Sequence, residues 1–144
     1  MSEALCVKEL VKDYRSLFGR PHRALRGLTL SVPRGAAFGL IGPNGAGKTT
    51  FIKVLLGVAR ATSGEVSVLG GEPGDLAVRA RIGYLPERLH LPSALRARDF
   101  LRSVATLKGL AVSDAQLAQA LDRVGLRADA RRIGTFSKGM RQRL

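Results

Sequence analysis

Short apolar runs dominate the first part of the chain, and their patterns predict strands. Residues 4–11 and 24–32 have the length and composition of strands, and the second run ends at a Pro-Arg-Gly turn. The uninterrupted apolar run at residues 36–41 predicts a buried strand. Residues 65–69 alternate between polar and apolar positions as a half-exposed strand does, and residues 82–85 form a further short strand. We therefore expect a β-rich first part.

Helical spacing appears between these runs and then takes over. Residues 48–57 and 96–108 repeat apolar side chains at the spacing of one helix face, and each is closed by a glycine. Residues 75–81 can form a short helix, and Ser113 can cap a helix that runs to Val124. The expected apolar face of the longer helix consists of four side chains: Phe100, Leu101, Val104 and Leu107.

The most specific motif lies between the apolar run at 36–41 and the first predicted helix. It fits the phosphate-binding P-loop pattern, in which glycines let the backbone curl and point its N–H groups at an anion. The following helix adds the positive end of its dipole. Lys48 is expected to contact the β- and γ-phosphates of ATP, and Thr49 to offer its hydroxyl to Mg²⁺. The expected phosphate-binding residues are Gly42, Pro43, Asn44, Gly45, Ala46, Gly47, Lys48, Thr49 and Thr50.

Charge changes this picture little. The 144 residues carry 24 lysines and arginines against 11 acidic residues, a net charge of +13 that would suit nucleic acid or an anionic membrane surface. The basic residues are spread along the whole chain, and aromatic residues make up only 5%, too few for a base-stacking platform. We attribute the charge to a bias of composition and expect no nucleic-acid partner.

Composition also bears on the compartment. Hydrophobic residues make up 45% of the chain, and no apolar run approaches the roughly 20 residues that span a bilayer. The start of the chain lacks the pattern of a signal peptide. The single cysteine, Cys6, cannot form an internal disulfide and is expected to be a small core residue. These features favour the cytoplasm.

A second motif resembles one that is typical of a protein family. Residues 136–144, Phe-Ser-Lys-Gly-Met-Arg-Gln-Arg-Leu, resemble the signature motif of ABC-type ATPases, Leu-Ser-Gly-Gly-Gln followed by Arg-Gln-Arg. Ser137 and Gly139 match, whereas Lys138 and Met140 replace a glycine and a glutamine. Ser137 follows Lys48 by 89 residues, a separation typical of the family. The Ser-Lys-Gly-Met form looks like the branch that pairs with ABC-2-type export permeases.

Two further positions carry the resemblance. Residues 84–87, Tyr-Leu-Pro-Glu, look like the Q-loop, with Glu87 at the position where most members carry a glutamine that reaches Mg²⁺ or the attacking water. A solvated glutamate in a loop is the plainer interpretation. Tyr14 resembles the aromatic residue that stacks on adenine, with Phe18 as its rival, and either ring can simply be a packing residue.

The resemblance implies an α/β fold: a P-loop NTPase sheet core, an N-terminal antiparallel β portion and an inserted helical subdomain. It covers only the front of an ABC ATP-binding domain, so residues 1–144 are expected to be an incomplete domain, with a β-rich core over 1–89 and a helical subdomain over 90–144. The Walker B strand, its aspartate, the catalytic glutamate and the switch histidine of the family do not occur. Without that strand, residues 36–41 are expected to expose an unpaired apolar edge.

The family's function follows as an expectation. Two copies would sandwich two ATP molecules, with Ser137 and Gly139 of one copy, at the start of a helix, facing the phosphates held by the other. Hydrolysis would drive export through a partner permease, with the subunit peripheral to the membrane at its cytoplasmic face. This chain by itself is expected to bind ATP without hydrolysing it.

Three alternatives stay open to different degrees. The chain can be a nucleotide-binding module without hydrolysis, or part of a soluble ABC protein of DNA repair or translation. The 89-residue separation leaves no room for the long coiled coils of the repair type, whereas the tandem domains of the translation type are not excluded. A small-molecule kinase shares the P-loop but not the Ser-Lys-Gly-Met sequence at residues 137–140.

Overall fold

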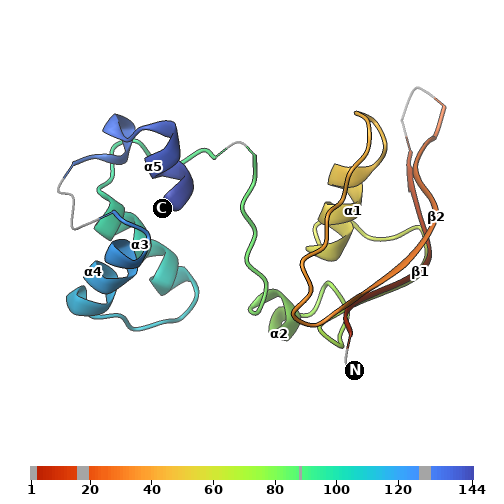
Figure 1. The fold of residues 1–144 in the computed structure, drawn as a ribbon, viewed down its shortest axis with the longest axis horizontal. Coiled ribbons are helices and arrows are strands. Elements are labelled where there is room, and N and C mark those ends of the chain that lie inside the picture. Colours follow the sequence, from red (N-terminus) through yellow and green to blue (C-terminus); the bar gives the residue numbers. More distant parts are fainter. Residues whose placement is uncertain (1–2, 16–19, 88, 127–130) are drawn as a thin grey trace. The chain divides into compact units, whose positions relative to one another are not determined.

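The chain folds into two compact units, Met1–Gly83 and Tyr84–Leu144. The computed structural model describes residues 3–15, 20–87, 89–126 and 131–144 (Figure 1). The first unit contains the strands and the phosphate loop, and the second contains the signature motif on a small helical assembly.

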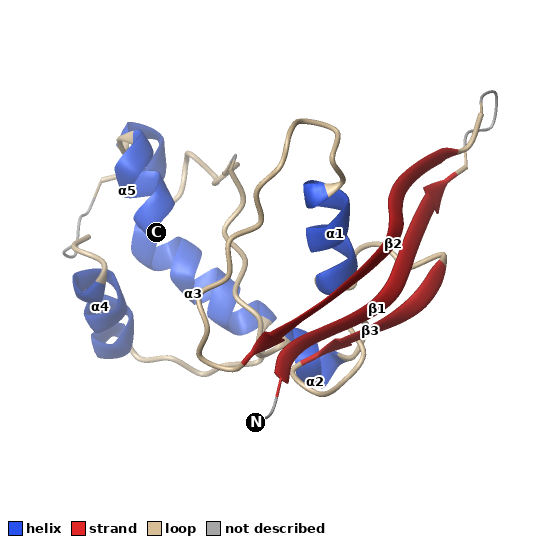
Figure 2. Ribbon diagram, turned by 45° about the vertical axis from the view of Figure 1, so that its right-hand side comes forward, coloured by secondary structure: helices blue, strands red, loops and turns tan. Residues whose placement is uncertain are grey.

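A three-stranded antiparallel sheet forms the frame of the first unit. Its strands are β1 (Glu3–Tyr14), β2 (His22–Pro33) and β3 (Ser63–Val68), in the order β2-β1-β3 (Figure 2). Val7 pairs with Leu30 on one side and with Val66 on the other. The strands predicted at residues 4–11, 24–32 and 65–69 are therefore confirmed, with shifted ends.

A bulge in β1 directs two core side chains to the same face. Val7 and Leu10 are three residues apart, so a regular strand would send them to opposite faces, yet both are fully buried in one cluster. Between them, Lys8 and Glu9 face the single residue Thr29 of β2, and Glu9 has a positive φ of 47°. The Thr29 hydroxyl accepts a hydrogen bond from the Glu9 backbone N–H at 2.9 Å, which holds the bulge in place.

One helix covers this core. Helix α1 (Lys48–Leu55) buries Phe51 and Val54 against the cluster of Val7, Leu10 and Leu25, at a gain of about 1.5–3 kcal/mol for each side chain. Figure 2 shows α1 lying beside the sheet. The predicted end of the helix is confirmed: Gly57 follows it with φ +68°, and a Cβ there would lie 2.3 Å from the Pro73 carbonyl oxygen. The short helix predicted at 75–81 is α2 (Leu76–Arg79), whose Val78 is buried.

Two predicted strands are absent, and both predictions were wrong. Residues 36–41 form a loop in which Ile41 is 95% exposed and Phe38 54% exposed, and residues 82–85 also form a loop. A strand exists only where a neighbour supplies a ladder of hydrogen bonds, and within the described part of the chain no strand pairs with either segment. The apolar side chains of residues 36–41 are exposed as expected, but on a loop and not along the edge of a strand.

Helices α3 (Ala97–Leu107), α4 (Asp114–Arg123) and α5 (Lys138–Arg143), with the 3₁₀ turn Ile133–Thr135, make up the second unit. Its core gathers Ala97, Leu121, Leu126 and Phe136, against which Leu101, Met140 and Leu144 pack. The predicted apolar face of 96–108 was wrong at Leu107, which is 86% exposed. In the described part of the chain no helix is long and apolar enough to cross a membrane.

Helix α4 begins and ends as predicted. The Ser113 hydroxyl accepts a hydrogen bond from the Gln116 N–H at 3.3 Å, and the Gln116 side chain accepts one from the Ser113 N–H at 2.8 Å. This reciprocal pair is a capping box. At the other end Gly125 follows with φ +65°, in the left-handed conformation that closes a helix.

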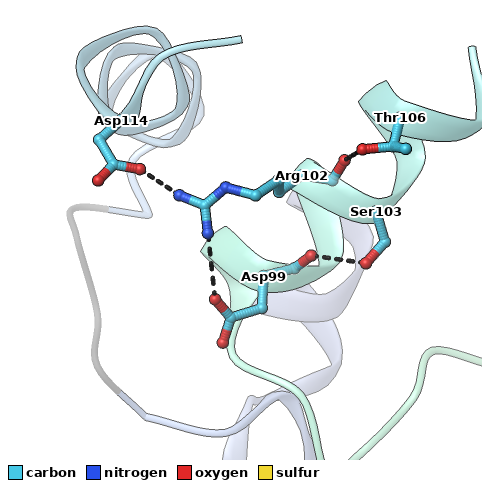
Figure 3. A network of polar contacts seen from close by, with 5 residues as sticks. All are labelled: Asp99, Arg102, Ser103, Thr106 and Asp114. Atoms are coloured by element: carbon cyan, nitrogen blue, oxygen red, sulfur yellow. Dashed lines mark hydrogen bonds and ion pairs between the residues drawn. The ribbon is translucent and has the colours of Figure 1, made fainter. Parts of the chain in front are cut away.

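An ionic network connects α3 to the start of α4 (Figure 3). The Arg102 guanidinium pairs with Asp114 and also lies 3.7 Å from Asp99. The hydroxyl groups of Ser103 and Thr106 donate to carbonyl oxygens one turn earlier in α3. The Arg102 and Asp114 side chains are 45% and 68% exposed, so each pair contributes at most about 1 kcal/mol. The network therefore joins α3 to the start of α4 with little gain in stability.

We expect the ion pair between Asp13 of β1 and Arg23 of β2 to weaken in acid. Arg23 donates to both carboxylate oxygens, at 2.8 and 3.0 Å, and these hydrogen bonds hold the pKa of Asp13 below its usual value. The pair therefore stabilises the hairpin above the usual aspartate pKa, and this contribution is lost as the pH falls through the lowered value. An NMR titration should find the pKa of Asp13 raised in Arg23→Gln; an unchanged pKa would contradict the pairing.

Candidate functional site

The P-loop is closed around its own lysine. The Lys48 ammonium donates to the carbonyl oxygens of Gly42 at 2.5 Å and Pro43 at 2.8 Å, so the side chain folds back over the loop. The Ala46 N–H also donates to the Pro43 carbonyl, at 3.2 Å. The sequence pattern gave no signal for these contacts, because the pattern describes the loop with a phosphate in it. They gather the loop residues around the positive charge.

The start of α1 offers unused hydrogen-bond donors. The first N–H groups of a helix have no partner within the helix, and among the described residues no side chain caps α1 and no acidic residue stands in its first turn. The positive end of the helix dipole is thus left free for an anion. The Thr49 hydroxyl lies in the same exposed turn, with no hydrogen-bond partner among the described residues. Backbone donors, a hydroxyl and an ammonium together suit a phosphate chain.

Gly47 fixes the loop against the sheet. It has φ +89°, which disfavours any residue with a Cβ. An added Cβ would lie 2.5 Å from the carbonyl oxygen of Ala24 and 2.9 Å from the Leu25 side chain. Gly45 has a similar φ, +85°, but open space around it. Both glycines allow the loop to curl, but only Gly47 also allows the loop to pack closely against β2.

A groove of about 540 Å³ runs between the loop and β2. Tyr14 is not one of the residues that line the groove, but it pairs across the sheet with His22, which is. The Tyr14 ring is 39% exposed, and the Lys12 ammonium lies 4.9 Å from its centre. Phe18, the rival of Tyr14, lies outside the described residues. The groove is lined by residues 22–28 and 45–48, Leu40, Ile41 and Phe51.

The signature residues lie at the start of α5 in the second unit. The Ser137 hydroxyl accepts a hydrogen bond from the Met140 N–H at 3.2 Å, so Ser137 is the N-cap of the helix. Gly139 is exposed, with open space where a Cβ would stand. Phe136, only 3% exposed, anchors the motif in the core. The motif is therefore held from behind by packing and presents its polar residues to the solvent.

Glu87 also belongs to the second unit, where it lines a hollow of about 390 Å³. The hollow brings its carboxylate to the same surface as His90 and two cations of α5, Lys138 and Arg141. Neither motif predicted basic side chains beside Glu87. No group of three or more potential His, Cys, Asp or Glu metal ligands occurs among the described residues.

Comparison with known proteins agrees with the motifs. The family model for the ABC transporter matches residues 25–144. This chain belongs to the ABC transporter family. An uncharacterised ABC transporter ATP-binding protein of Synechocystis is 39% identical, in an alignment that covers 94% of this chain and 40% of the relative. A lantibiotic transport ATP-binding protein of Streptococcus pyogenes is 36% identical, over 93% of this chain and 57% of the relative.

A solved structure shows the same fold. The ATP-binding cassette MJ0796, in a dimeric structure bound to ADP and phosphate, superposes with a TM-score of 0.79 at 22% identity, over 96% of this chain and 66% of that one. The α/β fold expected for an ABC ATP-binding domain is thus confirmed. The chain spans about half the length of the two relatives.

Proposed function

We propose that this chain is the front part of an ABC-type ATPase that binds ATP and, in the whole protein, hydrolyses it to power export. The observation that carries the proposal is the P-loop. It brings the ammonium of Lys48 and the uncapped start of α1 to one glycine-rich turn. No other class of ligand explains a free helix dipole and a lysine on one glycine-rich turn as well as a nucleotide phosphate chain does.

Phosphate binding follows from the loop contacts. An incoming phosphate chain draws the Lys48 ammonium from the Gly42 and Pro43 carbonyls to its β- and γ-phosphate oxygens. The exchange replaces two neutral acceptors by charged ones, and hydrogen bonds to charged groups are stronger. The backbone N–H groups at the start of α1 hold the same phosphates and keep their orientation. Thr50 lies in the first turn of α1 and completes the phosphate-binding set with the residues that form the loop: Gly42, Pro43, Asn44, Gly45, Ala46 and Gly47.

Mg²⁺ fits the residues available. The Thr49 hydroxyl is an oxygen at the loop with no hydrogen-bond partner among the described residues. The sequence resemblance suggests the Glu87 carboxylate as a second ligand. Mg²⁺ prefers oxygen ligands and commonly takes only one or two from a protein, with water and phosphate oxygens completing the shell. Bound Mg²⁺ would neutralise charge on the β- and γ-phosphates. Thr49 and Glu87 would hold and orient it.

A second copy completes the site in our proposal. Ser137 and Gly139 lie exposed at the beginning of α5, where N–H groups lack partners within the helix. We place the γ-phosphate of the ATP held by the opposite subunit against them. The cassette with the same fold is dimeric and binds ADP and phosphate, which supports a second copy at the nucleotide. Tyr14, which pairs with His22 of the groove beside the loop, would stack on the adenine.

Export is the physiological direction we propose. The Streptococcus relative is named for lantibiotic transport, and the Ser-Lys-Gly-Met sequence of residues 137–140 resembles the export branch. The chain would act at the cytoplasmic face of the membrane, bound to a permease that carries the substrate path. Alternation of the ATPase dimer between ATP-bound and released forms would drive that permease between two states.

The phosphate loop predicts which nucleotides bind. Isothermal titration of this chain with ATP, ADP and AMP in Mg²⁺ should give similar affinities for ATP and ADP, and binding at least about tenfold weaker for AMP, because AMP lacks the phosphate that Lys48 and the loop N–H groups contact. Equal affinities for all three nucleotides would show that recognition rests on the adenosine, and would contradict the assignment of the loop.

A further inference from the structure

One side chain joins the signature helix to its neighbour. The Arg143 guanidinium donates from Nη1 to the carbonyl oxygens of Val124 at 3.2 Å and Gly125 at 3.5 Å, at the C-terminal end of α4. Its Nε donates to the Gly139 carbonyl at 3.4 Å, within α5. The three carbonyls belong to two different segments, so Arg143 links the signature glycine to the end of α4.

The end of α4 is built to receive this cation. The last carbonyl groups of a helix lack partners within it and carry the negative end of its dipole, so a guanidinium is favourable there. Gly125 makes the approach possible, because an added Cβ would lie 2.9 Å from the Arg143 Nη1 atom. Gly125 thus serves two purposes: its φ of +65° closes α4, and its missing side chain leaves room for Arg143.

Apolar packing alone would hold α5 loosely. Met140 and Leu144 pack against the core, but neither is fully buried. Hydrophobic contact is not directional, so it permits rotation of the helix about its axis. Hydrogen bonds to fixed carbonyls restrict that rotation. Among the described residues the other two cations of α5, Lys138 and Arg141, make no side-chain hydrogen bond or ion pair.

We propose that Arg143 is a positioning residue that fixes the orientation of Ser137 and Gly139 toward the nucleotide by joining the Gly139 carbonyl to the C-terminal end of α4. The inference rests on the proposed role of these two residues at the phosphate of the opposite subunit. Arg143 does not itself touch the nucleotide. It sets how closely the N–H groups of the first turn of α5 match the phosphate, and displacements of about 1 Å in such contacts change rates strongly.

The test uses the full-length ATPase. In Arg143→Gln we expect the Kd for MgATP, measured on the monomer, to stay within twofold of wild type, because the P-loop is unchanged. The kcat for ATP should fall about tenfold. Arg143→Lys keeps the charge but has no planar fork, so it can reach fewer carbonyls and should show a smaller loss, about threefold. A fall in kcat without a change in Kd distinguishes positioning from nucleotide binding.

Arg123→Gln is the matched control. Arg123 stands in the last turn of α4, so its removal takes the same charge from the same helix end without touching the Arg143 hydrogen bonds. Its kcat should stay within twofold of wild type. Hydrogen exchange gives a second readout: the hydrogen-bonded amides of residues 140–143 should exchange faster in Arg143→Gln, while those of α3 keep their protection. If α3 also loses protection in Arg143→Gln, that variant disturbs the whole unit, and the milder Arg143→Lys variant becomes the test. A wild-type kcat in Arg143→Lys would then overturn the proposal.

The outcomes separate this inference from the proposed function. Wild-type ATP binding and turnover in Lys48→Ala would remove the proposed function and the inference with it. Loss of turnover in Lys48→Ala, together with wild-type kcat and unchanged exchange in Arg143→Gln, would leave the function standing and show that Arg143 does not position the signature.

Discussion

Lys48→Ala should reduce ATP turnover of the full-length protein at least about 100-fold while leaving the fold intact. The ammonium has no buried partner; its contacts are two exposed loop carbonyls, so its loss costs little stability. Against phosphate the same ammonium forms charge-assisted hydrogen bonds, worth a few kcal/mol together. Steady-state phosphate release and nucleotide titration measure the two effects, and circular dichroism checks the fold.

Lys53→Ala is the control for this variant. Lys53 is exposed in the last turn of the same helix, at the end that attracts cations rather than anions. Its removal takes an equal charge from α1 without altering the loop, and turnover should remain near wild type. Turnover by Lys48→Ala within twofold of wild type would sink the assignment of the P-loop.

Gly47→Ala should be the most destabilising single change in the loop. The alanine would adopt φ near +89° and place its Cβ 2.5 Å from the Ala24 carbonyl oxygen, so either the loop or β2 must move. We expect a cost of about 2–5 kcal/mol, the sum of left-handed strain and overpacking. Thermal unfolding followed by circular dichroism measures this loss of stability. Nucleotide affinity should also fall, because the loop moves away from its position against β2.

Gly45→Ala separates the two causes. Gly45 shares the positive φ, +85°, but nothing lies within 4 Å of an added Cβ. Strain alone should cost about 1–2 kcal/mol. The difference between the two variants measures the approach of the loop to β2. Equal melting temperatures for the two alanine variants would mean that this approach contributes nothing.

Local patterns predicted the elements that need only local causes. The cap at Ser113 began α4 where expected, and the left-handed glycines Gly57 and Gly125 closed α1 and α4 where expected, because each of these boundaries is decided within one turn of the chain. The three strands of the antiparallel sheet followed from alternation and turns. The bulge at Glu9 had no sequence signal, since it arises from Thr29 and Gly64 on the neighbouring strands.

The failures share a physical origin. Residues 36–41 and 82–85 have the composition of strands. Composition indicates that a segment prefers the extended conformation, but it does not show whether a neighbouring strand is present to pair with it. Ladder hydrogen bonds come from another segment, and the described residues contain no strand beside either run. Leu107 failed for a similar reason: a helical face is buried only where something covers it, and in α3 the small residues Ala97 and Ala105 are buried instead.

The candidate site was predictable in chemistry but not in geometry. The P-loop and signature patterns predicted Lys48, Ser137 and Gly139 as candidates from residue type and spacing. Neither pattern predicted that Lys48 folds onto the Gly42 and Pro43 carbonyls, or that Arg143 bonds to the end of α4. The acceptors in both contacts are backbone carbonyl oxygens. Every residue type has the same backbone oxygen, so a sequence pattern cannot show which one will accept a hydrogen bond.

The bulge in β1 bears on how the sheet assembles. A regular strand between two partners can slip by one or two residues and pair in a wrong register that differs little in energy. Here Glu9 takes a left-handed turn whose carbonyl meets Gly64 of β3, where a Cβ would lie 2.4 Å from the Glu9 oxygen, and whose N–H meets Thr29 of β2. A slipped strand would place a side chain against that carbonyl and lose the Thr29 hydroxyl. The bulge thus selects the correct strand register during folding, because only one alignment of the three strands accommodates it.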